Sequence, residues 1–137
     1  MRKLFRYALR ITNYALRIAF LLCAAVLMMS STCAAENLKF IDAMEDTGYY
    51  YDGDSVKSEG NDVFRVDMAV IKASINRMYV YDVRINHADK TYEILSSKIL
   101  SYDTRAEIET NKSRRPVQTY SDKSELGQMV RLILYGE

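Results

Sequence analysis

Few residues in this 137-residue chain have the types and spacing that catalysis needs. His87 is the only histidine, and the polar segment 86–89 around it is typical of a turn. A catalytic zinc site needs about three protein ligands, and both cysteines, Cys23 and Cys33, lie near the N-terminus. A serine triad needs a histidine base, and neither a Gly-x-Ser-x-Gly motif nor a glycine-rich phosphate loop occurs. The sequence therefore predicts no enzyme, no metal and no cofactor.

The segment that begins at Asp52 and Asp54 has the alternating acids of a calcium loop. An EF-hand also needs a glutamate at the twelfth position, which is Val63 here. We therefore interpret the segment as a turn that follows a run of tyrosines.

Tyrosine is the enriched residue: nine of the 11 tyrosines follow residue 35. Tyr79, Tyr81 and Tyr92 alternate with polar residues, which favours a place in the core. The consecutive run 49–51 cannot point inward at every position, so we expect at least one exposed ring. Tyrosine is also enriched in recognition surfaces. We predict a protein-binding surface over residues 49–54, joined by a basic loop; its main residues are Tyr49, Tyr50, Tyr51, Asp52, Arg114 and Arg115.

Three alternating runs, at 62–72, 78–86 and 91–102, are typical of β-strands. A hairpin turn is expected at 86–90, and a phase slip at Ser96-Ser97 indicates a bulge. Shorter strands are expected at 37–42 and 49–51.

The C-terminal segment has the 3.6-residue period of an amphipathic helix. Ser121 or Asp122 is the expected N-terminal cap, and Gly136 the expected stop. The apolar stripe comprises Leu126, Met129, Val130, Ile133 and Leu134. One apolar sheet face and one helix stripe must cover each other. The predicted fold is α+β: an antiparallel β-sheet meander with a C-terminal amphipathic helix packed on one face.

The N-terminal segment, residues 1–35, has the order of an export signal. It contains five of the 19 basic residues and none of the 18 acidic ones, then an apolar block at 18–29 and a small-residue ending at Ala35. We expect cleavage after Ala35, which leaves a domain at 36–137. An uncleaved anchor and a lipidated Cys33 remain the alternatives, and the signal or anchor is the only membrane contact that we expect.

The remaining chain carries 14 basic and 18 acidic residues, a net charge of −4. This balance argues against a nucleic-acid partner, which would need a basic face. Because both cysteines precede residue 36, the exported domain has no disulfide.

The segment Gly48-Tyr49-Tyr50-Tyr51-Asp52-Gly53-Asp54-Ser55-Val56 resembles the opening segment of the surface-adhesin protein E family. The strands at 64–72, 79–86 and 91–95 and the final helix follow in that family's order, and the similarity covers Phe40 to Leu134. The chain departs from the family in lacking its tryptophans, its cysteine pair and a glycine in Thr104-Arg105-Ala106.

The resemblance implies a small exported domain of a Gram-negative bacterium, which binds host matrix or plasma proteins in the family's named members. We therefore expect a non-enzymatic, adhesin-like protein-binding module, secreted to the periplasm or the cell surface. Its partner would be a host matrix or envelope protein, and the sequence leaves a homodimer open. The alternative is an envelope structural or stress-related module with no external ligand.

Overall fold

The computed structural model describes residues 11–19 and 36–136. The chain divides into two units, Met1–Ala35 and Glu36–Glu137. In the first unit, residues 11–19 form an exposed helix. Within the described residues, no helix is long and apolar enough to cross a membrane. The predicted apolar block beyond residue 19, Cys33 and the cleavage site at Ala35 lie outside the described residues.

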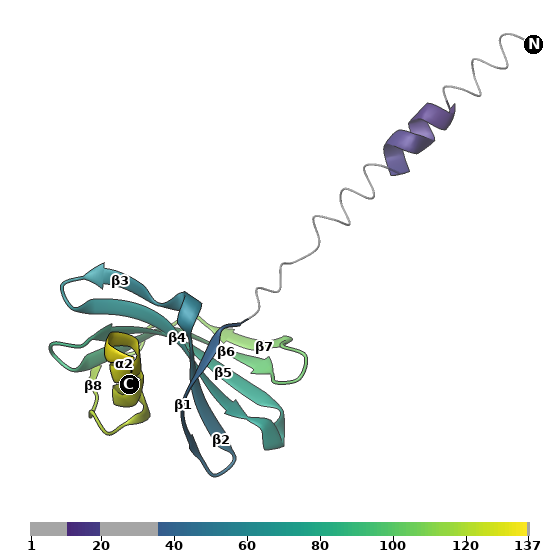
Figure 1. Cartoon of the computed structure of the whole chain (residues 1–137). Helices are drawn as coiled ribbons and strands as arrows, with labels where there is room; N and C mark the ends of the chain where they lie inside the picture. Colours follow the sequence, from purple (N-terminus) through teal and green to yellow (C-terminus); the bar gives the residue numbers. More distant parts are fainter. Residues whose placement is uncertain (1–10, 20–35, 137) are drawn as a thin grey trace, which may run out of the picture. The chain divides into compact units, whose positions relative to one another are not determined.

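The second unit consists of one antiparallel sheet and one helix (Figure 1). Its strands are β1 (Leu38–Met44), β2 (Thr47–Asp52), β3 (Lys57–Gly60), β4 (Val63–Lys72), β5 (Arg77–Asn86), β6 (Thr91–Ser101), β7 (Glu107–Asn111) and β8 (Gln118–Thr119). Two short 3-10 turns, η1 (Gly53–Ser55) and η2 (Ala73–Ile75), and helix α2 (Glu125–Tyr135) complete it. The order is β1-β2-β4-β5-β6-β7, with β3 on β4 and β8 on β6. The predicted α+β fold, an antiparallel meander with a C-terminal helix, is confirmed.

The three long strands that the alternation of apolar and polar residues predicted are present as β4, β5 and β6. β4 and β5 pair over their whole lengths, from Val63 opposite Asn86 to Lys72 opposite Arg77. The predicted bulge is present at Leu95, one residue before the expected position, because Asp82 pairs with Ser96 and Val83 with Ile94. The sequence did not indicate β3 and β8, which are four and two residues long and carry no apolar alternation.

Both faces of the sheet contain buried apolar residues, although the sequence predicted only one apolar face. The helix-side core comprises Ile41, Phe64, Val66, Met68, Val83, Ile85, Met129 and Val130. A second cluster on the opposite face comprises Ala69, Ile71, Met78, Val80 and Leu100, against which Leu38 and Tyr50 pack. The first strands of the sheet, β1 and β2, therefore contribute side chains to both clusters.

Helix α2 begins two or three residues later than its expected caps, Asp122 or Ser121, imply. Ser124 is the N-terminal cap: its hydroxyl accepts a hydrogen bond from the Gly127 N–H at 3.2 Å, so the prediction of Ser121 or Asp122 was wrong. Gly127 is required where the helix meets the preceding turn, since a Cβ there would lie 2.3 Å from the Ser121 carbonyl oxygen. Gly136 ends the helix at φ 72°, as predicted.

The helix buries a stripe that differs from the predicted one at its C-terminal end. Met129 and Val130 are buried, and Leu126 and Ile133 pack against the core as expected. Leu134 was assigned to the stripe but is 37% exposed, while Leu132 packs against the core in its place.

Candidate functional site

The predicted tyrosine run forms the middle of β2, between β1 and β4. Tyr49 and Tyr51 pack against the helix-side core, and Tyr50 packs on the opposite face. The Tyr50 ring meets the exposed Phe40 ring edge to face, with centroids 5.7 Å apart. All three tyrosines are half-buried, so none is the exposed ring that we expected. A binding role for this run stays a prediction.

Asp52 has a structural role at the end of β2, where it stabilises the turn that follows. Its carboxylate accepts a hydrogen bond from the Asp54 N–H at 2.9 Å, and its carbonyl oxygen accepts one from the Ser55 hydroxyl at 2.7 Å. These contacts cap η1, the turn that the sequence predicted here.

The two predicted arginines point to different partners. Arg114 holds Glu93 with both Nε and Nη2 at 2.8 Å, and this hydrogen bonding lowers the pKa of Glu93. The Arg115 N–H donates to the Ile94 carbonyl at 2.9 Å, while its guanidinium lies 5.8 Å from the centre of the Tyr81 ring. That distance is within the range of a cation–π contact. Arg114 is therefore occupied by an ion pair, whereas Arg115 forms none with the described residues.

Helix α2 covers only part of the sheet face on which it lies. It has 11 residues, which gives a length of about 16 Å, whereas the ten-residue β4 extends roughly 33 Å. β8, which precedes the helix, pairs with β6 at Thr91 and Tyr92, and β7 pairs with the other half of β6 from Ser97 onward. Figure 1 shows α2 and β7 at opposite sides of the sheet. No described helix or strand covers the half of this face that lies near β7.

Strand register places two rows of side chains across this face, since directly paired residues project from the same face. One row contains Tyr49, Val70, Tyr79, Ile99 and Glu109. The next row, two residues along, contains Tyr51, Met68, Tyr81, Ser97 and Asn111. The short Ser97 side chain stands between the larger Tyr81 and Asn111, so the second row has a gap.

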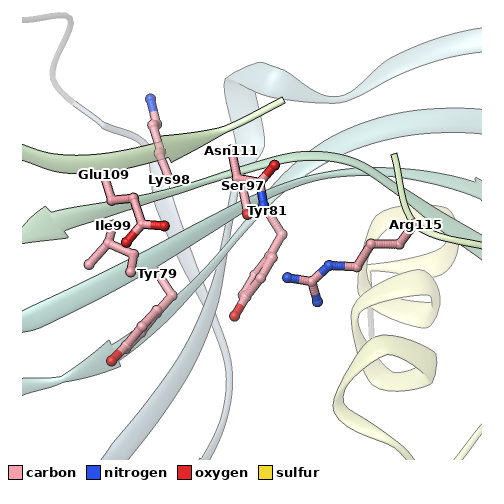
Figure 2. Close-up of a pocket in the computed structure, with 8 residues that line it drawn as sticks. All are labelled: Tyr79, Tyr81, Ser97, Lys98, Ile99, Glu109, Asn111 and Arg115. Atoms are coloured by element: carbon pink, nitrogen blue, oxygen red, sulfur yellow. The ribbon is translucent and has the colours of Figure 1, made fainter. Parts of the chain in front are cut away.

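A hollow of about 230 Å³ opens at this gap. Its lining consists of Tyr79, Tyr81, Ser97, Lys98, Ile99, Glu109, Asn111 and Arg115. Figure 2 shows Glu109 beside Ile99, at the end of the hollow where Tyr79 lies, and Arg115 reaching toward Tyr81 from the other side, while the Lys98 amine points away. The hollow therefore combines aromatic walls with one acid and one base. We call it the tyrosine hollow.

Tyr79 and Tyr81 were predicted to be core residues, and that prediction was incomplete. Tyr81 packs against the edge of the helix-side core, but both rings are only half-buried and line the tyrosine hollow. Alternation reports which face a side chain occupies and does not report how far along that face the helix extends. The small Ser97 opposite Tyr81 was the available signal, and it becomes visible only once the strand register is known.

Other candidates for chemistry have structural explanations. His87 lies in the β5–β6 turn as predicted, with Nε2 3.6 Å from Asp62 and its ring 6.2 Å from Phe64. Among residues 11–19 and 36–136, no group of His, Cys, Asp and Glu side chains is arranged to hold a metal ion. What the tyrosine hollow can do is bind: its rings offer apolar contact, and its charged groups offer directional hydrogen bonds.

No protein-family model, no curated protein and no solved structure matches the chain. The resemblance to the surface-adhesin protein E family therefore stays a prediction made on its residues.

Proposed function

We propose that residues 36–137 form a non-enzymatic bacterial domain that works outside the cytoplasm, in the periplasm or at the cell surface, and binds another protein there. Export is supported by the sequence alone, through the acid-free basic start and the uncharged segment from Ile18 to Ala35. Binding is supported by one structural observation, the tyrosine hollow on the uncovered half of the helix-side face.

The composition of the tyrosine hollow is what favours a protein ligand. Tyrosine and arginine are the residue types that most often carry the binding energy of protein interfaces, where large rings supply area and arginine supplies hydrogen bonds. Tyr79 and Tyr81 are half-buried, so a partner would complete their burial without any rearrangement of the sheet. Arg115 is exposed and meets no carboxylate within the described part of the chain.

The test fills the hollow and leaves the rest of the domain as it is. The full chain, tagged at its C-terminus, is expressed in a Gram-negative host, and proteolysis of intact cells reports whether the domain reaches the surface. Partners are then cross-linked in the cells and captured with the wild type, with Ser97→Leu and with the control Thr110→Leu. Thr110 is exposed and pairs with Lys98 on the opposite face of the sheet, outside the hollow.

We expect one protein to be captured by the wild type and the control and lost by Ser97→Leu, with unchanged circular dichroism in all three. Capture that is equal in both variants would place the interface elsewhere. A domain that reaches the envelope and captures no protein would contradict binding and favour a structural module without a ligand.

A further inference from the structure

The sheet curls so that segments from its two ends meet on the face opposite the helix. Glu36 lies just before β1, and its carboxylate is 3.0 Å from the Nε of Arg105, in the loop between β6 and β7. β1 and β7 are the first and last strands of the sheet order, so this ion pair joins opposite ends of the sheet. Leu38 of β1 also packs over the second apolar cluster. The sheet therefore forms an incomplete barrel, an architecture that can hold one small ligand inside.

The interior of this incomplete barrel contains a cavity of about 160 Å³, which we call the barrel cleft. Its floor is apolar and at most 9% exposed; the floor residues are Ala69, Met78, Val80 and Leu100. Its rim is charged; the charged rim residues are Glu36, Asp52, Asp67 and Lys98. A second hollow of about 210 Å³ shares Asp67, Val80 and Lys98 with the barrel cleft and adds Asp82.

Asp67 is the acid of the barrel cleft that is open to a ligand. The other three acids, Glu36, Asp52 and Asp82, each hold an arginine or a backbone N–H. The Asp67 carboxylate makes no ion pair or hydrogen bond with the described residues. Burial first, and then the like charge of Asp82, raise the pKa of Asp67. Its ionised form is therefore poorly solvated, which distinguishes Asp67 from charged groups that water solvates at the exposed surface.

We propose that the barrel cleft binds a small primary alkylamine, with the ammonium group on the Asp67 carboxylate and the alkyl chain over Val80 and Leu100. An ammonium group supplies the charge-assisted hydrogen bonds that Asp67 lacks, and the alkyl chain covers the apolar floor. The barrel cleft and the tyrosine hollow lie on opposite faces of the sheet, so this inference is independent of the proposed function.

The chemistry of the barrel cleft selects against other classes of ligand. An anion would meet the carboxylates of Asp52 and Asp67 with only the Lys98 amine to oppose them. An uncharged apolar molecule would cover Asp67 and leave its carboxylate without a partner, which is costly. A metal ion would need several converging ligands, and no such group of side chains is present in the described part of the chain.

Lys98 is the internal competitor of such an amine. It pairs with Val80 across the strands, and its positive charge opposes the rise that burial causes in the pKa of Asp67. The Lys98 amine nevertheless forms no ion pair with Asp67 among the described contacts. Removal of the Lys98 charge should therefore strengthen the attraction of Asp67 for an added ammonium group, whereas removal of the Asp67 charge should weaken it.

The experiment titrates four small probes into the full chain and follows the amide signals of Ala69, Val80 and Leu100 by NMR. The probes are n-butylamine, methylamine, 1-butanol and butyrate, at pH 7 and constant ionic strength. The affinity for n-butylamine should exceed that for methylamine and that for 1-butanol at least about tenfold, because methylamine lacks the chain and 1-butanol lacks the charge. Butyrate should be the weakest probe. Equal affinities for n-butylamine and either of its two partial analogues would overturn the proposal.

Three variants then test the role of Asp67. Asp67→Asn should weaken the binding of n-butylamine at least about tenfold, and Lys98→Met should tighten it about threefold or more. The matched control Glu45→Gln removes one negative charge from the exposed turn between β1 and β2, outside the barrel cleft, and should keep the wild-type affinity.

Two results with these variants would contradict the assignment of Asp67. One is an equal loss of affinity in Asp67→Asn and Glu45→Gln, which would show a general effect of net charge. The other is an unchanged or weaker affinity in Lys98→Met. Should Asp67→Asn fail to fold by circular dichroism, Lys98→Met carries the test, because Lys98 is exposed and its replacement keeps the length of the side chain.

Discussion

The docking of α2 can be tested at Met129, whose side chain is 0% exposed in the helix-side core. Replacing a buried methionine by alanine removes its apolar contacts and leaves a cavity, which costs about 2–5 kcal/mol. Alanine forms helix slightly better than methionine, and that gain of a few tenths of a kcal/mol does not offset the loss. At about 3 kcal/mol, the melting midpoint of a domain of this size should fall by roughly 12–24 °C.

The assay is thermal unfolding of the full chain followed by circular dichroism, with Leu134→Ala as the matched control. Leu134 lies on the same helix but is 37% exposed, so its replacement should change the free energy of unfolding by no more than about 0.5 kcal/mol. Equal shifts for the two variants would refute the docking through Met129. A larger shift at Leu134 would restore the stripe that the sequence suggested.

For two further substitutions, the structure predicts the direction in which the melting midpoint changes. Gly127→Ala should lower the midpoint although alanine is the better helix former, because its Cβ would lie 2.3 Å from the Ser121 carbonyl oxygen; an unchanged or raised midpoint would contradict this close approach. Burial first, and then the charge of Asp82 opposite, raise the pKa of Asp67 above its ordinary value of 3.8. The folded state therefore holds this proton at a higher pH than the unfolded state, and stability falls as the pH rises from 3.8 through the raised pKa. Asp67→Asn should remove that loss and raise the midpoint at neutral pH, as measured by thermal unfolding from pH 3 to pH 8; an unchanged pH profile would contradict it.

The elements of this domain were predictable where local pattern is strong. Ten-residue strands such as β4 alternate clearly, and the hairpin turn at 87–90 has its own polar signature, in which Asn86 accepts hydrogen bonds from the N–H groups of Ala88 and Asp89 at 3.1 Å. The burial of Ile71 and Val80 on the opposite face was not predictable. It depends on Leu38 and Tyr50, which the sheet brings over that face from β1 and β2.

The N-terminal cap of helix α2 could not be predicted from the sequence for a different reason. Ser121, Asp122 and Ser124 are all suitable cap residues within four positions, so local chemistry offers several solutions. The choice is made by the turn that precedes the helix. Ser124 bonds both ways, donating to the Ser121 carbonyl at 2.6 Å and accepting from Gly127, and the lack of a side chain at Gly127 permits that tight turn.

The candidate site depends on the register between strands that are distant in sequence. The different roles of the consecutive Arg114 and Arg115 illustrate this dependence. β6 pairs with β8 at its start and with β7 from Ser97 onward, so the outer edge between them is free of strand partners. The loop fills this gap: Arg114 bonds the Glu93 side chain, and the Arg115 N–H bonds the Ile94 carbonyl beside the bulge at Leu95. Neighbouring residues in an extended loop project to opposite sides. Once Glu93 holds Arg114 on one face, Arg115 must lie on the other, over Tyr81. A sequence that predicts a basic loop cannot distinguish these two arginines, because their roles are assigned by β6, some twenty residues earlier.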